Sequence, residues 1–524
     1  MPHPGPRPGV GRILLGRVWI PSAPSEVLHP SHPRTPGGNL FFKQGISVRA
    51  GTPIELVVPN AFRGDVSVDF AAGPVPGASS LGEGENAIFV EPCPADSQGP
   101  WTAFSGGFLS RRLICAALVV RVEGRTERLP IGLGKRCWKT GRAMFQALTE
   151  TLQVTFNDSV TPPTATWKDV SPLLTSVDTL DPILFTDPAT GRTFVSQLYL
   201  ACSLMAFSDD DGGTWIQNPL GCGPGAAVDH QTVGGGPFAP PLSNPVYPHA
   251  VYYCAQAIAE AACAESVTGG ATFGPGVPMY TLFACGGLHG HIKVGPDGTA
   301  YVPNADCGGQ QGFALSTDNG ATWNVRTVPD SSTQDESDPS VGIASDGTVY
   351  FGYADGDGHP RIAVSRDKGV SWSTPVDVGV PFGIENTQFP AVVAGDGDRA
   401  AFAFLGTPTP GDDQSAGFTG VWHLYVAYTY DRGLTWTTVD ATPNDPVQRG
   451  CIWLGGGSNP CRNLLDFMDA TVDAQGRVLV GFADGCVGTC VTTGGPSSSR
   501  ASKATISRQT AGEGLFASGH APGT

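Results

Sequence analysis

The sequence has few charged residues, no apolar run long enough to cross a membrane, and no apolar secretory-signal core near its start. Charged residues make up 15% of the chain, and acidic residues exceed basic ones, which gives a formal net charge of -16. This charge disfavours nucleic acid and anionic membrane surfaces as partners. An anionic substrate would need a locally basic site. Because the first residues lack a signal core, either the natural start lies upstream or export uses another route.

Glycine and proline are abundant, and cysteine is frequent. The 71 Gly and 46 Pro among 524 residues predict many short strands and turns. The 13 cysteines, many of them close in sequence, predict disulfides, an oxidising compartment and an extracellular or cell-surface location. Their spacing fits neither a zinc ribbon nor a redox motif. Five expected pairs leave over Cys93, Cys115 and Cys137, so one of these three thiols should be unpaired. The expected pairs are Cys202–Cys222, Cys254–Cys263, Cys285–Cys307, Cys451–Cys461 and Cys486–Cys490.

One octamer pattern, Ser/Thr-x-Asp-x-Gly-x-Ser/Thr-aromatic, recurs along the chain. In a tight β-turn the Asp side chain accepts backbone N–H bonds, and the Gly adopts a positive φ that other residues resist. The aromatic residue begins the next strand and packs between sheets. The copies are SDDDGGTW from Ser208, STDNGATW from Ser316, SRDKGVSW from Ser365, TYDRGLTW from Thr429, and a worn copy, SVTGGATF, from Ser266.

This octamer resembles the Asp-box, or bacterial neuraminidase repeat, of sialidase-type β-propellers, and four full copies make the match specific. The resemblance implies that each octamer forms the turn between the third and fourth strands of a blade, on the face away from the active site. Octamers spaced roughly fifty residues apart suit one four-stranded blade per repeat. A structural role is therefore expected for the octamer carboxylates Asp210, Asp318, Asp367 and Asp431.

The predicted fold is all-β: a six-bladed, sialidase-like β-propeller preceded by a small antiparallel β-sandwich. A strand-turn-strand signal such as VGIASDGTVYFGY lies ahead of the octamers, and TVDAQGRVLVGF marks a sixth unit without one. The predicted domains are a flexible Pro/Gly-rich segment (1–38), the β-sandwich (39–137), a linker with ring-closing strands (138–178) and the propeller (179–518). The linker is expected to contain a short helix at Trp138–Glu150 and a strand pair, Leu152–Phe156 and Thr164–Val170.

The register of the repeats predicts a functional face. If the octamer turns lie at one end of the blades, the starts of the first strands lie at the other end, around the central channel. His289, Asp338 and Gln388 lie eight residues before the Asp-Gly turn of their units, and His291 and Asp469 lie six before it, so all share one strand face. The candidate catalytic residues are Asp181, Asp229, His230, Asp338 and Asp469, and the candidate substrate-binding residues are His289, His291, Glu385, Gln388, Arg449, Arg462 and Trp453.

Clustered acids and histidines are typical of acid/base chemistry or of a site for a hard cation. No cofactor is required, but a divalent cation in the central channel is an alternative. Its candidate ligands are His289, His291, Asp338 and Asp469. The loop Asp355-Gly-Asp357-Gly-His359 faces the same way and is interpreted as a solvated turn.

The resemblance to sialidases is poor at the site. That family clamps the substrate carboxylate with three arginines, one typically in an Arg-Ile-Pro motif ahead of the first box, and uses a Tyr/Glu nucleophile pair and an Asp acid/base. No Arg-Ile-Pro precedes Ser208, and only Arg449 and Arg462 are placed to reach the channel mouth. The arginine triad needed for bidentate carboxylate recognition is therefore not found, and exo-sialidase activity is not supported.

Three functions remain open, and the sequence leaves the oligomeric state undecided. The first is an exported glycoside hydrolase that acts on carbohydrate or glycoconjugate through the channel carboxylates. The second is a polysaccharide lyase or metal-assisted enzyme that uses the channel His and Asp residues. The third is a non-catalytic propeller that binds glycan or protein, for which Trp422, Tyr425 and Trp453 are the aromatic candidates.

Overall fold

The computed structural model describes residues 11–14, 17–21, 27–28, 30–31, 35, 37–51, 53–59, 62–71, 80–91, 101–123, 125–134, 142–157, 163–172, 180–199, 202–219, 229–242, 247–334, 337–465, 468–473, 475–497 and 501–517. The chain is nearly all β, as predicted. In these ranges helical structure is limited to short segments such as η2 (Val380–Phe382) and α1 (Thr489–Thr493). No described helix is long and apolar enough to cross a membrane. The chain divides into an N-terminal unit, mainly Met1–Lys139, and a C-terminal unit, Thr140–Pro188 with Arg192–Pro522.

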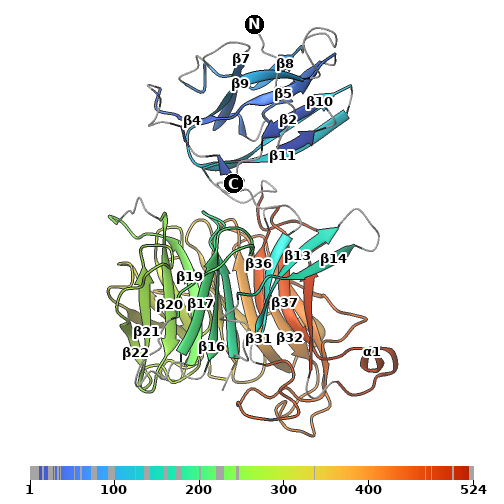
Figure 1. Ribbon diagram of the computed structural model, residues 1–524. Coiled ribbons are helices and arrows are strands. Elements are labelled where there is room, and N and C mark those ends of the chain that lie inside the picture. Colours follow the sequence, from blue (N-terminus) through green and yellow to red (C-terminus); the bar gives the residue numbers. More distant parts are fainter. Residues whose placement is uncertain are drawn as a thin grey trace. The chain divides into compact units, whose positions relative to one another are not determined.

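The N-terminal unit consists of two sheets that share one core. Its strands are β1 (Gly11–Leu14), β2 (Val18–Pro21), β3 (Val27–Leu28), β4 (Leu40–Lys43), β5 (Ile46–Arg49), β6 (Ile54–Val57), β7 (Val66–Ala71), β8 (Ala87–Val90), β9 (Trp101–Ser110), β10 (Ile114–Val122) and β11 (Arg125–Leu133). One sheet has the order β1-β2-β5-β9-β4, with β7 paired to β9, and the other has the order β3-β11-β10-β6-β8 (Figure 1). Every second residue of β10 enters the core between them, including Ala116, Leu118 and Val120.

The segment 1–38 is not flexible throughout, although its composition predicts this. Strand β1 pairs with β2, and β2 pairs with β5 through Val18 and Trp19. Val18 is fully buried in the shared core. The pairing and this burial outweigh the Pro/Gly-rich composition around them.

The C-terminal unit consists of antiparallel sheets that follow one another along the chain. The first three are β12 (Arg142–Ala147), β13 (Glu150–Asn157) and β14 (Thr164–Asp169); β15 (Leu180–Thr186), β16 (Thr193–Tyr199), β17 (Cys202–Ser208) and β18 (Ile216–Gln217); and β19 (Asp229–Pro237), β20 (His249–Gln256), β21 (Glu260–Ser266) and β22 (Val277–Thr281).

The next two sheets are β23 (Lys293–Val294), β24 (Ala300–Asn304), β25 (Gly312–Ser316) and β26 (Asn324–Thr327), then β27 (Ser340–Ile343), β28 (Val349–Ala354), β29 (Pro360–Ser365) and β30 (Val376–Asp377). The last two are β31 (Asn386–Ala394), β32 (Ala400–Thr407), β33 (Val421–Thr429), β34 (Thr437–Asp440) and β35 (Gln448–Arg449), then β36 (Asp469–Val472), β37 (Val478–Asp484) and β38 (Lys503–Arg508).

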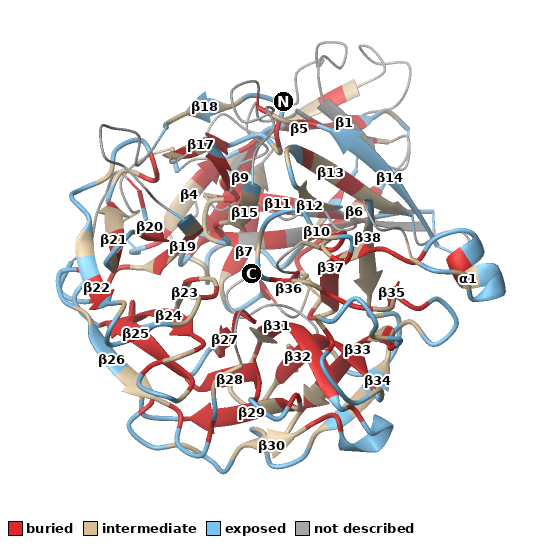
Figure 2. Ribbon diagram, turned by 90° about the horizontal axis from the view of Figure 1, so that it is seen from below, coloured by how far each residue is buried: buried red, intermediate tan, exposed pale blue. Residues whose placement is uncertain are grey.

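The first strand of each sheet contacts the first strand of the next sheet, in the order β12, β15, β19, β23, β27, β31 and β36. Figure 2 shows these strands toward the middle of the unit and strands such as β22, β26, β30 and β34 at its rim. Second strands are therefore covered by a sheet on each face. This explains why β28 and β32 are continuous apolar runs that are buried at every position.

The sheet β12–β14 lies between the sheets that begin with β15 and β36. Phe145 of β12 contacts Gly481 of β37, and the Arg508 guanidinium lies 4.4 Å from the centroid of the Phe156 ring. The predicted strand pair around Leu152 and Thr164 is present as β13 and β14. The predicted helix at Trp138–Glu150 is wrong, because its described part forms β12, whose pairing with β13 outweighs helix propensity.

The octamers form the predicted turns between the third and fourth strands of their sheets. In the turn at Asp210, one carboxylate oxygen accepts the Thr214 N–H at 2.7 Å, the other accepts the Thr214 hydroxyl at 3.0 Å, and Gly212 has φ +83°. Asp318, Asp367 and Asp431 repeat these bonds. In the worn copy, the Thr268 hydroxyl replaces the carboxylate and accepts the Thr272 N–H at 2.9 Å.

Four of the predicted disulfides are present: Cys254–Cys263, Cys285–Cys307, Cys451–Cys461 and Cys486–Cys490. The fifth predicted pair involves Cys222, which lies outside the described residues, as do Cys93 and Cys137. Only the backbone of Cys115 is described, in β10.

Candidate functional site

The starts of the first strands lie at the opposite end of their sheets from the octamer turns. In an antiparallel four-stranded sheet the third strand runs parallel to the first, so the octamer after it lies at the end of the first strand and away from its start. Asp181, Asp229 with His230, Gln388 and Asp469 lie at or near the starts of β15, β19, β31 and β36. His289 and His291 precede β23, and Asp338 precedes β27. All eight are therefore at one end of the unit.

The structure brings His230 and Asp338 into contact. His230 Nε2 lies 2.7 Å from Asp338 Oδ2, and both side chains are largely buried. Burial alone would lower the pKa of His230, but the Asp338 carboxylate, with Asp181 and Asp229 further away, raises it to about 9. His230 is therefore an imidazolium at neutral pH.

Asp181 and His230 occupy equivalent bulges in neighbouring sheets. Strand pairing shifts register after Leu180 in β15 and after Asp229 in β19, and the bulged residues Asp181 and His230 have φ of 44° and 50°. Such left-handed values are costly for residues with a side chain. The two bulges are joined, because Gln231 Nε2 donates to the Asp181 carbonyl at 2.9 Å. A bulge of this kind re-aims a side chain, and no sequence signal marks it.

His289 lies beside His230 as a neutral ring. The two ring centroids are 5.4 Å apart with the planes nearly perpendicular. Burial, helped by the positive charge of His230, lowers the pKa of His289 to about 3. Its Nδ1 therefore donates to the Gly290 carbonyl at 3.1 Å, which leaves Nε2 as a buried acceptor without a partner. Asp338 Oδ1 is also buried and without a partner.

His291, Lys293 and Asp469 form a second charged group. Asp469 Oδ2 lies 3.2 Å from His291 Nδ1, and Asp469 Oδ1 lies 3.8 Å from Lys293 Nζ. Burial alone would raise the pKa of Asp469, but Lys293 and His291 hold it well below its usual value. His289 connects the two groups electrostatically, because positive charge on His230 or His291 lowers the pKa of His289. We call Asp181, Asp229, His230, His289, His291, Lys293, Asp338 and Asp469 the His–Asp cluster.

Gln388 contacts an acid that the sequence interpretation missed. Its Nε2 donates to Asp413 Oδ2 at 2.9 Å, and its Oε1 is buried without a partner. Burial raises the pKa of Asp413 above its usual value. Asp413 lies in the loop between β32 and β33, within GDDQS, and nothing in that segment marks it as buried.

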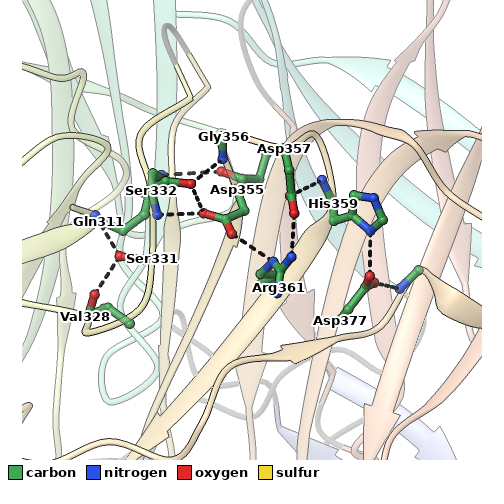
Figure 3. Close-up of polar contacts among 12 residues, drawn as sticks. Gln311, Val328, Ser331, Ser332, Asp355, Gly356, Asp357, His359, Arg361 and Asp377 are labelled. Carbon is green, nitrogen blue, oxygen red and sulfur yellow. Dashed lines mark hydrogen bonds and ion pairs between the residues drawn. The ribbon is translucent and has the colours of Figure 1, made fainter. Parts of the chain in front are cut away.

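Glu385 belongs to a different polar network. Its Oε2 lies 4.0 Å from His359 Nε2. His359 Nδ1 in turn lies 2.6 Å from Asp377 Oδ2 (Figure 3). Arg361 pairs with both Asp355 and Asp357. The sequence predicts a solvated turn here, but Asp355 is buried and also accepts the Ser332 N–H and hydroxyl, both at 2.7 Å. No contact of the described residues joins this network to the His–Asp cluster.

Arg449, Arg462 and Trp453 lie in the segment that the Cys451–Cys461 disulfide closes. Arg449 Nε donates to the Cys490 carbonyl at 3.2 Å, and Trp453 Nε1 donates to the Gly456 carbonyl at 2.8 Å. These hydrogen bonds of Arg449 and Trp453 are not with members of the His–Asp cluster. In the parts of the chain that the structure describes, no group of three or more His, Cys, Asp or Glu residues is placed to hold a metal ion.

Trp422 and Tyr425, the other aromatic candidates, are buried in the core. A different aromatic residue is exposed at the same end of the unit. Phe283 is fully exposed, on the turn between β22 and His289. Two N–H bonds to the Thr281 carbonyl and the Cys285–Cys307 disulfide hold this turn. It follows the fourth strand of its sheet and so lies at the same end as the cluster.

Comparison with known proteins gives weak structural similarities. No protein-family model matches the chain, and no curated protein matches it. The solved structures that resemble it include the Hadza microbial sialidase Hz136, with 13% identity, a TM-score of 0.38, and coverage of 92% of this chain and 99% of that one. A protein of unknown function from Dyadobacter fermentans DSM 18053 has 14% identity, a TM-score of 0.37 and coverage of 61% and 92%. The NanB sialidase from Streptococcus pneumoniae has 8% identity, a TM-score of 0.35 and coverage of 70% and 80%. At these values the similarities carry no further argument.

Proposed function

We propose that the chain is an exported glycoside hydrolase whose C-terminal unit is a six-bladed, sialidase-like β-propeller. In this proposal β12–β14 close the ring between the first and last blades, and the N-terminal unit is a β-sandwich. The recurring octamer turns, the contacts between successive first strands and the four disulfides support this architecture and an oxidising location. The His–Asp cluster at the strand starts would be the site for carbohydrate.

The proposal depends on one observation: His230 Nε2 lies 2.7 Å from the Asp338 carboxylate, and against the effect of burial this carboxylate, with the charges of Asp181 and Asp229, raises the pKa of His230 to about 9. The His230 imidazolium gives its proton to the glycosidic oxygen as the bond to the anomeric carbon breaks. A carboxylate, Asp229 or Asp181, takes a proton from the water whose oxygen joins that carbon. Asp338 holds the His230 ring and favours its charged form, and Asp469 does not supply a proton because its pKa is held low.

A lyase is the second candidate, favoured by neutral His289. A lyase needs a base that removes a proton next to a carboxylate, and His289 Nε2 is a neutral nitrogen without a partner, although its low pKa makes it a weak base. Its product would contain a carbon–carbon double bond, whereas a hydrolase consumes water and forms none. Ultraviolet absorbance of the products separates the two reactions.

The test is a turnover screen on aryl glycosides and natural glycans, with and without EDTA. We expect hydrolysis that is insensitive to EDTA, with kcat/KM reduced about 10²–10⁴-fold in His230→Gln and Asp229→Asn. Asp229 is exposed, so its variant should fold normally. Asp398→Asn, the same charge change in the turn between β31 and β32 at the other end of the sheet, is the control. Unchanged rates in both site variants would contradict the proposal.

A further inference from the structure

Gln388 occupies in β31 the position that Asp229 occupies in β19. Strand pairing shifts register after Gln388, as it does after Asp229. The residue that follows, Phe389, has a left-handed φ of 56°, like His230 with its φ of 50°. The two bulges therefore give Gln388 and Asp229 equivalent places in their sheets, at the same end of the unit. Because Asp229 is one of the two proposed bases, its counterpart Gln388 is a candidate for contact with the substrate.

Asp413 determines which end of the Gln388 amide is left for a ligand. An ionised carboxylate only accepts hydrogen bonds, so the amide atom 2.9 Å from Asp413 Oδ2 is the nitrogen, Nε2. The amide oxygen, Oε1, then points away from Asp413 and is buried without a partner among the described residues. Asp413 is itself held in place, because its main-chain carbonyl accepts the Ile452 N–H at 3.0 Å.

The unpartnered oxygen of Gln388 favours a ligand that donates a hydrogen bond. A buried acceptor without a bond is unfavourable, so a donor that reaches it is bound more tightly. Gln388 is only 1% exposed, so the donor group has to be small. A single sugar hydroxyl is small and donates, whereas a fluorine atom in the same place can only accept.

Resting on the proposed function, we propose that Gln388 recognises one hydroxyl of the sugar through Oε1, and that Asp413 is the positioning residue that keeps this oxygen turned toward the substrate. Asp413 itself touches no substrate. In Asp413→Asn the new amide can donate to Oε1 as well as accept from Nε2, so the Gln388 amide is no longer fixed in one orientation. The preference for a hydroxyl at that position of the sugar then falls.

The first test measures kcat/KM of the full chain on nitrophenyl glucoside, galactoside and mannoside and on their analogues in which fluorine replaces one hydroxyl at a time. At one ring position we expect wild type to prefer the hydroxyl through this contact by about 10–10²-fold. Fluorine also changes the reactivity of the sugar, but equally for every variant. The change in the hydroxyl-to-fluorine ratio between variants therefore isolates the contact.

Asp413→Asn should reduce this ratio about tenfold. The matched control is Asp412→Asn, the same change in the adjacent, exposed acid, which should keep the ratio of wild type. Combining Gln388→Glu with Asp413→Asn exchanges the two groups, so the new amide donates to the new carboxylate and an acceptor again faces the substrate. This double variant should regain the ratio, which a general structural defect would not do. Turnover with the same ratio in Asp413→Asn as in wild type would overturn the inference and leave the proposed function standing.

A second test needs no activity. In the chain labelled with isotopic glutamine, the NMR signals of the Gln388 side-chain amide are those that Gln388→Glu removes. We expect this amide to exchange its protons with water slowly in wild type and in Asp412→Asn, and about tenfold faster in Asp413→Asn, where the charged acceptor is lost. Equal exchange in all three would overturn the positioning role. Faster exchange with no turnover of any glycoside would confirm that role but refute both the proposed function and the recognition of a sugar hydroxyl.

Discussion

His291 Nδ1 lies 3.2 Å from Asp469 Oδ2, although the two residues are 178 positions apart in sequence. His291 precedes β23 and Asp469 begins β36, and the sheets that start with β27 and β31 lie between them along the chain. The pair, with Lys293, therefore joins the third of the four-stranded sheets to the last sheet of the unit. This link bypasses two intervening sheets, so it couples distant parts of the chain directly.

The first prediction concerns this link and low pH. The pKa of Asp469 is lower in the folded chain than in the unfolded one, so its stabilisation is present above the unfolded value of about 3.9 and is lost as pH falls through and below that value. Asp469→Asn should lower the free energy of unfolding at neutral pH by about 1 kcal/mol or less, because the side chain is 40% exposed. Thermal unfolding at several pH values should show the difference from wild type shrinking on acidification. A difference that stays constant with pH would contradict the role of this ion pair.

The second prediction concerns His230 and high pH. Its folded pKa of about 9 exceeds the unfolded value of about 6.5, so its stabilisation is fully present below that value and is lost as pH rises through 9. Activity that needs the imidazolium should fall over the same range. Histidine-selective NMR titration measures the pKa directly, and Asp338→Asn should lower it by about one to three pH units. An unchanged pKa in that variant would show that Asp338 does not set the charge of His230.

The third prediction concerns the octamer turns. Asp367 accepts the Ser371 N–H at 2.8 Å, the Ser371 hydroxyl at 2.6 Å and the Ser365 hydroxyl at 2.9 Å. Asp367→Ala removes all three bonds and should reduce the free energy of unfolding by about 1–3 kcal/mol, with a smaller loss in Asp367→Asn. Denaturant unfolding measures the loss. Glycan turnover by the folded variants should be unchanged, and a large loss of turnover would contradict the structural role.

The fourth prediction concerns Phe283. An exposed aromatic ring on a restrained turn offers a flat apolar face against which a sugar ring can pack. Phe283→Ala should raise the KM for long glycans several-fold and leave short aryl glycosides unaffected. Leu434→Ala is the control, since Leu434 is 78% exposed within an octamer turn at the other end of the unit. Equal effects of the two variants would argue against a glycan contact at Phe283.

Much of the fold could be predicted because the octamer turns depend on local chemistry. An Asp, a Gly and an aromatic residue at fixed spacing define the turn, and the turn then fixes the direction of the strands on either side. Strand β12 could not be predicted in this way, because its conformation depends on pairing with β13 and on the contact of Phe145 with β37. Such contacts are not visible in a short window of sequence.

The candidate site could be predicted in part for the same reason. The register placed His230, His291, Asp338 and Asp469 at one end of the sheets, and the structure brings them together in two linked groups. It did not predict the left-handed bulges at Asp181 and His230, which arise from strand pairing. The register also did not predict that Glu385, between η2 and β31, contacts His359 and not the His–Asp cluster.

The sheet β12–β14 comes first in the C-terminal unit, yet it contacts the last sheet through Phe145 with Gly481 and through Phe156 with Arg508. The first and last sheets of this unit therefore stabilise each other. A chain shortened to begin at residue 180 would lack Phe145 and Phe156, so β37 and β38 would lose these two contacts. Assembly of the unit cannot be completed until its earliest and latest strands have met.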